Sequence, residues 1–381
     1  MMIYTLVSFF LCTQSTFGQN LFWNRSWPFV HETGATQPVG TDPDDPAIWV
    51  HPYRPDLSLI IGTDKTAIIG GLYVFDLNGT VQQHIGNIDR PNNIDIEYGF
   101  QINTTHSIDL IVLTERLQKR LRIFSIDVST RRVYEIPVTN PNVFVDSSGA
   151  HSAPMGIGLY KRRHDGKIYA IISRKSGPTS GYLGQYELAW NGRSIDMKFT
   201  RYLGDFQGSE IESIVVDDQL GFVYYSDEGY GIRKYNIDPS HTDNAQVGLI
   251  NTTNIWQGDS EGLALYTTSA TDGYLIITDQ LPNGSIFHFY ERQGENAYVQ
   301  SIRTRADKTD GIDATSSYLG EKFPRGVLVV MNAIEKNFLL YDWRNIDKEL
   351  DLVKNNVCSF YQLHLLYLIL EFCIIVTIFV R

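Results

Sequence analysis

Short runs of alternating aromatic and aliphatic residues recur along the chain, and this pattern predicts β-strands. Six such runs lie at 71–76, 121–126, 184–188, 231–236, 286–291 and 338–343, and consecutive runs begin 50, 63, 47, 55 and 52 residues apart. Each is preceded by a second strand-like run that ends in polar residues, at 59–65, 109–116, 168–175, 222–228, 274–280 and 326–332. A third short run precedes each of these, at 47–50, 94–98, 156–160, 211–216, 262–266 and 311–314.

The regular spacing predicts an all-β protein with the architecture of a six-bladed β-propeller. A unit of three or more strands that repeats about every 50 residues is typical of this fold. An irregular pair of β-sandwiches is the alternative, but it does not account for the even spacing. Composition agrees, because the 22 Tyr and 19 Phe residues favour the half-buried surface of a sheet.

The two ends of the chain differ from this central part. Residues 1–18 carry no charged side chain and contain an apolar run at 3–12, which predicts a signal peptide cleaved near Gly18. A buried apolar strand is the alternative for this segment. Five N-x-S/T sites, at Asn24, Asn78, Asn103, Asn251 and Asn283, favour a secreted glycoprotein or one on the extracellular face of a membrane.

A hydrophobic tail occupies residues 353–381. Its segment 363–380 is long enough to span a bilayer and is interrupted only by His364 and Glu371. We therefore expect membrane contact through this tail. The alternatives are a lipid-anchor signal and a segment that is not part of the working protein. The predicted propeller domain is then residues 19–352.

Cysteine and charge exclude several classes of protein. Cys12, Cys358 and Cys373 all lie outside 19–352, so the propeller has neither a disulfide nor a zinc–thiolate site. The formal net charge is −11, and an acidic chain without a basic run is a poor candidate for binding nucleic acid.

Charged residues recur at equivalent positions of the predicted blades. At the start of the first short run stand Asp44–Asp45, Asp95, Glu212, Glu261 and Asp310. At the end of the second stand Asp64–Lys65, Glu115–Arg116, Arg174–Lys175, Asp227–Glu228 and Asp279–Gln280. Because equivalent positions of a propeller converge on its axis, we expect these side chains to meet at one end of the central channel. Ordinary solvated charges at strand ends are the alternative.

Crowded carboxylates protonate or bind cations, and ligands that are all oxygen favour Ca²⁺ before Mg²⁺. The interleaved Lys and Arg residues indicate a polyanionic substrate, with phosphate as the obvious group. A metal-bound water of lowered pKa could then attack phosphorus. The chain has neither an H-x-x-x-H pair nor a G-x-S-x-G motif that would indicate another chemistry.

Six motifs resemble those of the β-propeller phytases, in order, from about residue 40 to 345. They are 44–49 (DDPAIW), 92–96 (NNIDI), 212–218 with 224–228, 259–263 (DSEGL), 290–294 (YERQG) and 309–313 (TDGID). Members of that family are six-bladed, calcium-dependent enzymes that remove phosphate from myo-inositol hexakisphosphate. The resemblance therefore implies a phosphoric monoester hydrolase of the 3-phytase type.

The resemblance also implies roles for individual residues. The calcium carboxylates at the reacting phosphate, and so the catalytic residues, would be Asp44, Glu212, Glu228, Glu261 and Asp310. Substrate would be bound by Lys65, Arg116 and Lys175, with Gln280 as a further polar ligand. Asp45, Asn93 and Asp95 fall where the family binds calcium for structural purposes.

The chain departs from the family pattern at several positions. Met155 stands where bacterial members have a phosphate-binding Tyr, Thr66 replaces the second residue of a Lys pair, and Ser176 replaces an acidic residue. The acid-rich stretch before TDGID is shortened to residues 305–308, which puts one structural calcium in question. We expect altered affinity for substrate with the metal carboxylates intact.

The residues leave two other functions open. Another six-bladed calcium hydrolase, such as a lactonase or phosphotriesterase, would need a calcium at the channel but no ring of Lys and Arg. A non-catalytic extracellular recognition module would need no group of calcium-binding carboxylates.

Overall fold

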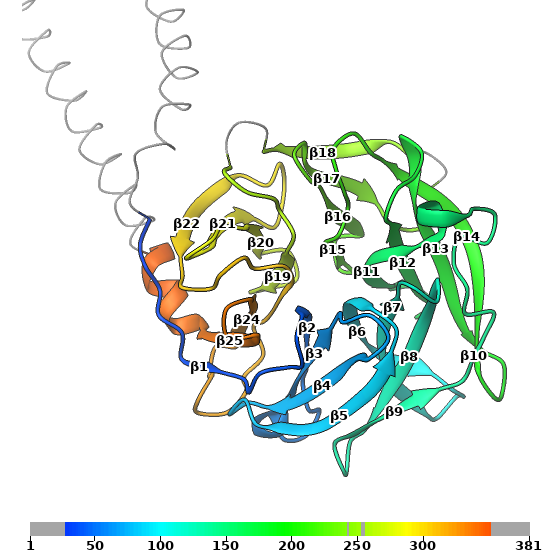
Figure 1. Cartoon of the computed structure of the whole chain (residues 1–381), viewed down its shortest axis with the longest axis horizontal. Helices are drawn as coiled ribbons and strands as arrows, with labels where there is room; N and C mark the ends of the chain where they lie inside the picture. Colours follow the sequence, from blue (N-terminus) through cyan, green and yellow to red (C-terminus); the bar gives the residue numbers. More distant parts are fainter. Residues whose placement is uncertain (1–26, 242–243, 253–255, 352–381) are drawn as a thin grey trace, which may run out of the picture.

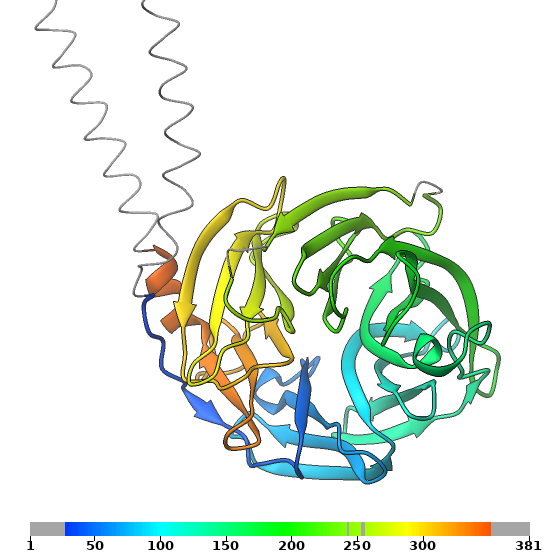
Figure 2. The same ribbon diagram turned by 45° about the horizontal axis from the view of Figure 1, so that its top comes forward.

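Six sheets stand radially around one axis (Figures 1 and 2). The structure is a computed structural model that describes residues 27–241, 244–252 and 256–351. The predicted all-β, six-bladed propeller is confirmed, and the three predicted runs of each repeat are the three inner strands of one blade.

Within each blade the strands follow one another from the axis outward. Blade one contains β2 (Pro43–Trp49), β3 (Leu59–Asp64), β4 (Gly70–Asp76) and β5 (Val81–Ile88), and blade two contains β6 (Pro91–Gln101), β7 (Ser107–Glu115), β8 (Arg120–Asp127) and β9 (Arg132–Ile136). Blade three contains β11 (Pro154–Lys161), β12 (Ile168–Arg174), β13 (Ser180–Trp190), β14 (Ile195–Asp205) and β10 (Val138–Thr139). Blade four contains β15 (Ile214–Asp217), β16 (Phe222–Asp227), β17 (Gly231–Asn236) and β18 (Gln246–Asn251). Blade five contains β19 (Leu263–Thr267), β20 (Gly273–Asp279), β21 (Ile286–Glu291) and β22 (Tyr298–Arg303). Blade six contains β23 (Ile312–Thr315), β24 (Val327–Asn332), β25 (Asn337–Asp342) and β1 (Gly34–Ala35).

Blade three explains the one long spacing in the repeat. Its fifth strand, β10, pairs in parallel with β14, and the short 3-10 helix η2 (Gly149–Ser152) follows before β11 begins. The extra residues therefore lie between blades two and three and leave the three inner strands of the repeat intact.

The ring is closed by the two ends of the described chain. β1 pairs antiparallel with β25, with Gly34 opposite Leu340, so blade six takes its outermost strand from the N-terminal side (Figure 1). A helix at 343–351 follows β25, which the sequence pattern did not predict. It buries Trp343, Ile346 and Leu350, whose spacing places them on one face of a helix.

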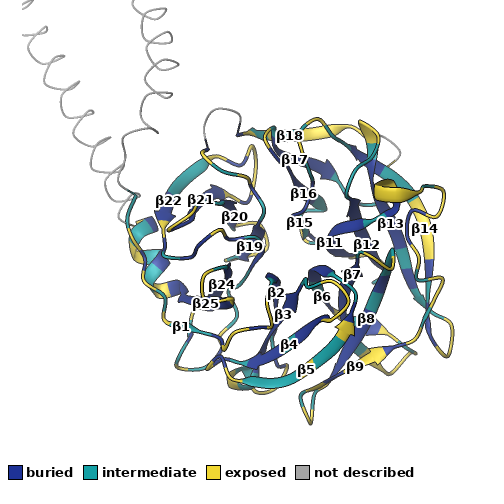
Figure 3. Ribbon diagram, viewed as in Figure 1, coloured by how far each residue is buried: buried dark blue, intermediate teal, exposed yellow. Residues whose placement is uncertain are grey.

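The core lies between neighbouring blades. Every residue of β3 is buried, and adjacent residues face opposite sides: Ile60 packs with Val329 and Phe338 of blade six, and Ile61 packs with blade two. The middle strands read as continuous apolar runs because both of their faces are covered, and Figure 3 shows the exposed residues gathered at outer strands and turns.

The predicted ends of the domain fall outside this description. The signal peptide at 1–18 and the hydrophobic tail at 353–381 are not among the described residues. Among the residues that are described, no helix is both long and apolar enough to span a membrane.

Candidate metal and phosphate site

In blades one to five the second strand ends in two consecutive polar residues. In blades one, four and five the first of the pair is an Asp that holds the loop leading into its own blade. Asp227 accepts hydrogen bonds from the backbone N–H groups of Gln207 (2.9 Å) and Gly208 (2.7 Å), and Asp279 accepts from Gln257 (3.1 Å) and Gly258 (2.7 Å). Asp64 binds the backbone of residues 41 and 42 in the same way. These carboxylates thus stabilise loops, contrary to the expectation that both members of each pair face the channel.

In the same three blades the second member of the pair, Lys65, Glu228 or Gln280, joins a group of carboxylates at the end of the channel where the innermost strands begin. We call this end the mouth. Glu228, which follows β16, lies there with Glu212, which precedes β15, and Glu261, which precedes β19. One carboxylate oxygen from each lies within 4.8 Å of the other two. Blades four and five together thus supply a compact group of three carboxylates that could hold a metal ion.

Burial and mutual repulsion make these three carboxyl groups weak acids. Burial, followed by the charge of Asp44, raises the pKa of Glu212 to about 7. Burial, followed by the charge of Glu212, raises the pKa of Glu228 to about 8. The pKa of Glu261 lies well above its ordinary value because of burial and the neighbouring carboxylate of Asp310. A cation among these groups would favour their charged forms.

Asp44 and Asp310 join the group through Lys65 and Gln280. The Lys65 ammonium lies 2.8 Å from Asp44 Oδ1 and 2.6 Å from Asp310 Oδ2. Gln280 donates from Nε2 to Glu261 Oε2 at 2.8 Å and to Asp310 Oδ1 at 2.6 Å. All five predicted catalytic carboxylates therefore lie in one cluster at the mouth.

The predicted phosphate-binding cations differ in their surroundings. Burial lowers the pKa of Lys65, but the carboxylates of Asp44 and Asp310 raise it more, so its pKa is above the ordinary value and Lys65 stays charged. Lys175 forms an ion pair with Glu210, a residue absent from the predicted site. Arg116 is half-buried, and burial together with the nearby Arg90 guanidinium lowers its pKa.

The donor atoms of the cluster suit a hard divalent cation. Four buried oxygens have no hydrogen-bond donor among the described residues: Asp44 Oδ2, Asn92 Oδ1, Asn93 Oδ1 and Glu228 Oε1. A buried polar atom without a partner is costly, and ligand binding is one way to satisfy it. Oxygen-only donors of this kind fit Ca²⁺ or Mg²⁺ better than Zn²⁺.

Asn92 is a site residue that the sequence analysis missed. Its side chain is fully buried, and its Nδ2 donates to Glu212 Oε1 at 3.0 Å across the channel. The motif NNIDI contains Asn92, but only Asn93 received a role. Asn93 received its role from the family resemblance alone, whereas both asparagines lie in β6 with buried side chains.

Asp45, Asn93 and Asp95 lie deeper in the channel and line a cavity of about 40 Å³. Asp95 accepts from the backbone N–H groups of Ile96 and Leu159, both at 2.7 Å, and so joins blade two to blade three. Asp45 Oδ2 accepts from the N–H of Ile94 at 3.0 Å, which joins blade one to blade two. Calcium binding by these residues stays a prediction, and their observed contacts are hydrogen bonds between blades.

Asp313 is a second missed residue, and it lines the same cavity. It accepts from the N–H of Ile48 at 2.7 Å, which joins blade six to blade one, and from the N–H of Ala314 at 2.7 Å. Burial raises its pKa to about 7 and that of Asp95 to about 8. The inner strands are thus held together by carboxylates as well as by apolar packing.

Two of the departures from the family pattern can be located in the structure. The Met155 side chain is buried at the start of β11 and offers no hydroxyl to a ligand. Thr66 donates from Oγ1 to Asp64 Oδ1 at 2.5 Å, so this hydroxyl helps to hold the loop of blade one. Neither residue is among the five predicted catalytic carboxylates, and altered substrate affinity at these two positions stays a prediction.

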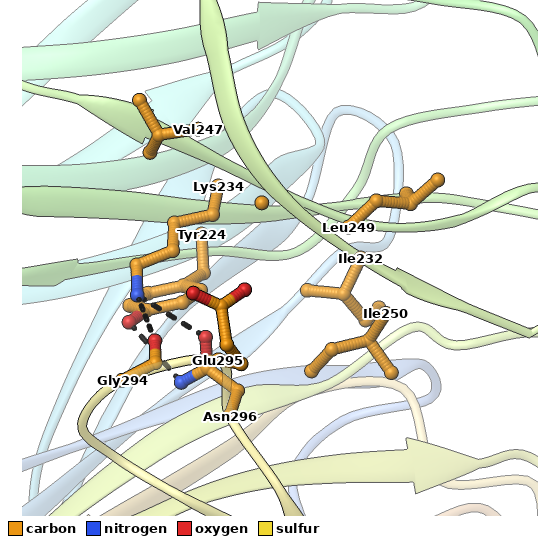
Figure 4. Close-up of a pocket in the computed structure, with 10 residues that line it drawn as sticks. Tyr224, Ile232, Lys234, Val247, Leu249, Ile250, Gly294, Glu295 and Asn296 are labelled. Carbon is orange, nitrogen blue, oxygen red and sulfur yellow. Dashed lines mark hydrogen bonds between the residues drawn. The ribbon is translucent and has the colours of Figure 1, made fainter.

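Lys234 occupies a separate pocket of about 30 Å³ away from the mouth (Figure 4). Its ammonium donates to the backbone oxygen of Gly294 at 3.0 Å and to Asn296 Oδ1 at 3.2 Å, and it lies 4.3 Å from the centre of the Phe222 ring. Because this buried cation is satisfied by blades four and five, we assign the pocket a structural role.

Comparison with known proteins agrees with this geometry. A family model described as Phytase matches residues 23–357. The chain is 31% identical over 347 residues to the 3-phytase of Bacillus subtilis (strain 168), and the match covers 84% of this chain and 86% of that protein. Among solved structures it is similar to a luciferin-regenerating enzyme (TM-score 0.44, 12% identity, 81% of this chain and 92% of that chain) and to the Dos1 propeller (TM-score 0.37, 11% identity, 75% and 64%). Neither of these two likenesses bears on function. The family model and the Bacillus relative show that the chain belongs to the phytase family of hydrolases.

Proposed function

We propose that this protein is a secreted, calcium-dependent phytase that removes phosphate from myo-inositol hexakisphosphate. The observation that carries the proposal is the cluster of Asp44, Glu212, Glu228, Glu261 and Asp310, which lies at the same mouth as Lys65. Carboxylates can gather a metal, and cations beside them can bind an anionic substrate. Membership of the phytase family supports phosphate monoesters of inositol as the substrate class.

Glu212, Glu228 and Glu261 would hold a divalent cation, with Asp44 and Asp310 at its border. When bound, such a cation supplies a Lewis acid for the phosphoryl oxygens and a source of nucleophilic water at neutral pH. The three carboxylates determine where the cation would lie, because they converge from three different segments between strands. Asn92 of blade two orients Glu212 through its 3.0 Å hydrogen bond.

Lys65, Arg116, Lys175 and Gln280 bind and orient the substrate in this proposal. Lys65 and Gln280 contact the carboxylates directly, so they are placed to hold the phosphate that reacts. Arg116 and Lys175 belong to blades two and three and extend the positive field along the mouth. This local field is needed because the whole chain carries a formal charge of −11 and repels a polyanion at long range.

The two alternatives are less well supported. A lactonase or phosphotriesterase would not require Lys65, Arg116 and Lys175 at the mouth. A recognition module would not require buried carboxylates whose pKa values are raised by one another. Family membership also favours a phytase over both alternatives.

Secretion and glycosylation remain part of the proposal. Asn78, Asn103 and Asn283 are exposed in the structure, as acceptor sites for N-linked glycans must be. Asn103 also accepts from the N–H of Thr105 at 2.9 Å, so this N-x-T site forms a tight exposed turn. Membrane contact through residues 363–380 stays a prediction. Expression in a secretory host with and without that tail, followed by fractionation, would test it.

One experiment tests the proposed function directly. Phosphate release from inositol hexakisphosphate is measured with calcium, with magnesium and with excess chelator, for the wild type and for Glu212→Gln. We expect release with calcium that is abolished by chelator and by the substitution. Full release in chelator would contradict calcium dependence, and no release under any condition would contradict the substrate.

A further inference from the structure

Arg90 and Arg116 are neighbours at the mouth, on the hairpin that forms the inner part of blade two. Pro91 at the start of β6 lies opposite Glu115 at the end of β7, so the next residues outward, Arg90 and Arg116, face each other across the two strands. Their backbones are joined by a hydrogen bond from the Arg116 N–H to the Arg90 oxygen at 3.1 Å. Two like charges directly opposite each other in a hairpin are unfavourable.

Neither guanidinium is neutralised. In the described parts of the chain, the side chains of Arg90 and Arg116 have no ion pair and no hydrogen bond, and Arg90 Nε is buried without a partner. Lys65 and Lys175 differ, because each is already paired with carboxylates of the cluster or beside it. Arg90 and Arg116 are thus the pair of cations that an anion could bind without first breaking an ion pair.

Arg90 is also held in a strained backbone conformation. Its φ is 59°, in the left-handed region that favours glycine, and the residue that follows it is Pro91, which further restricts its backbone. Strain of this kind persists where the surrounding structure demands it and is concentrated at functional sites. At Arg90 it coincides with a repulsive pair of charges, so two local costs occur at one residue whose side chain has no hydrogen bond or ion pair among the described residues in return.

From these observations we infer that Arg90 is a substrate-binding residue that acts with Arg116 on a second phosphoryl group, one other than the group that is attacked. The inference rests on the proposed function. Arg116 connects the proposed site of the second phosphoryl group with the carboxylate cluster. Its guanidinium interacts electrostatically with Arg90 and with the carboxylates of Glu212 and Asp44. A planar guanidinium pair matches phosphate oxygens well, and a bound phosphoryl group would satisfy the buried Arg90 Nε and remove the repulsion.

The inference explains how the chain can tolerate Met155. That residue removes a hydroxyl from the mouth on blade three, whereas Arg90 adds a charged donor on blade two. Substrates with several phosphates would gain from Arg90, while the carboxylate cluster would be unaffected by it.

The test compares Arg90→Gly with Arg131→Gly. Arg131 has a φ of 56° and lies in the turn between β8 and β9, at the end of blade two away from the mouth, so its substitution relieves the same strain without touching the site. We expect Arg90→Gly to raise KM for inositol hexakisphosphate about 10- to 100-fold with kcat changed by less than about threefold, because a charged hydrogen bond to a bound group is lost. Arg131→Gly should change neither constant, and Arg90→Lys should lie between Arg90→Gly and the wild type.

Binding of myo-inositol hexakissulfate, which the enzyme cannot hydrolyse as a phosphate ester, is measured by calorimetry in parallel. Its Kd should rise in Arg90→Gly by the same factor as KM. Loss of the strain and of the repulsion should keep the thermal midpoint at or above the wild-type value; if Arg90→Gly nevertheless does not fold, Arg90→Asn replaces it, since Asn also tolerates the left-handed region. Equal KM and Kd values in Arg90→Gly and Arg131→Gly would overturn the inference. If the wild type releases no phosphate, the proposed function fails, and the hexakissulfate measurement still decides the role of Arg90.

Discussion

The side-chain amide of Asn92 donates a 3.0 Å hydrogen bond to Glu212, 120 positions further along the chain. Blade two therefore fixes the orientation of a carboxylate that blade four carries. The bond uses the amide nitrogen and leaves Asn92 Oδ1 buried without a donor among the described residues. One short side chain thus serves the carboxylate cluster in two ways, as a donor to Glu212 and as a further oxygen at its edge.

The first prediction follows from this contact. Asn92→Leu removes the donor to Glu212 at nearly constant volume, and we expect calcium affinity, measured by calorimetry, to fall about 10- to 100-fold, as for other residues that orient metal ligands. The exposed Asn191→Leu serves as the control and should bind calcium like the wild type. Unchanged affinity in Asn92→Leu would show that Glu212 needs no support from blade two.

The second prediction concerns the carboxylates themselves. Glu261→Gln removes one charge from the cluster of three while keeping the size of the side chain, and turnover should fall by at least about 100-fold, equivalent to ~3 kcal/mol. Glu187→Gln is the matched control, since Glu187 forms a surface ion pair with Lys167. Steady-state phosphate release measures both. Similar turnover in the two variants would mean that phosphate is released at a site other than the carboxylate cluster.

The third prediction concerns pH and stability in the presence of EDTA. The pKa values of Glu212 and Glu228 are raised from 4.5 to about 7 and about 8, so between pH 4.5 and about 8 the folded protein binds more protons than the unfolded chain. The stabilisation from these protons is complete below pH 4.5 and is lost as pH rises through about 8. The thermal midpoint in EDTA should therefore fall from pH 5 to pH 8.

Calcium should reverse this trend, because it binds the deprotonated carboxylates. Melting curves with saturating calcium provide the comparison. In EDTA, the double variant Glu212→Gln/Glu228→Gln should show a smaller change of thermal midpoint with pH than the wild type. A midpoint in EDTA that rises steadily across the same window would falsify the assignment of these two groups.

The fourth prediction concerns the carboxylates that join the blades. Asp313→Ala leaves the buried N–H groups of Ile48 and Ala314 without their acceptor, and each such loss costs about 1–3 kcal/mol. The free energy of unfolding from urea titration should fall by about 2–5 kcal/mol in total. Asp196→Ala on the outer strand β14 should change it by less than about 1 kcal/mol. Equal stability of the two variants would mean that apolar packing alone holds blades six and one.

The architecture could be predicted from the sequence because each blade is a local unit with its own alternation of side chains. Runs such as 59–65 and 222–228 correspond to β3 and β16, and the ends of these runs mark the mouth. The positions of Glu212, Glu228 and Glu261 followed from this register, and the structure places them together. The helix at 343–351 was missed because it is short: Trp343, Ile346 and Leu350 have helical spacing, but three positions are too few to stand out beside the strand pattern that precedes them.

The remaining wrong or missing predictions share one cause. Each of these residues has a role that depends on a contact with a different segment of the chain. Asp64, Asp227 and Asp279 carry the same charge as the residues of the site, and only the neighbouring loop shows that their oxygens are already occupied. Asn92, Glu210 and Asp313 acquire their roles from contacts with other strands or loops. Sequence alone gives the type of such a residue and its place on a strand, but not what lies opposite.

The pairing of β1 with β25 also has a consequence for synthesis. Gly34 leaves the ribosome some 300 residues before its partner Leu340, so the first of the described strands to be made is the last to be paired. Contacts of such sequence separation form slowly, and until they form the edge of β25 and the apolar face of blade six are uncovered. The nascent chain must therefore be kept from associating with other chains until blade six is made, and a truncated product that lacks blade six exposes the apolar faces of blades one and five that blade six covers.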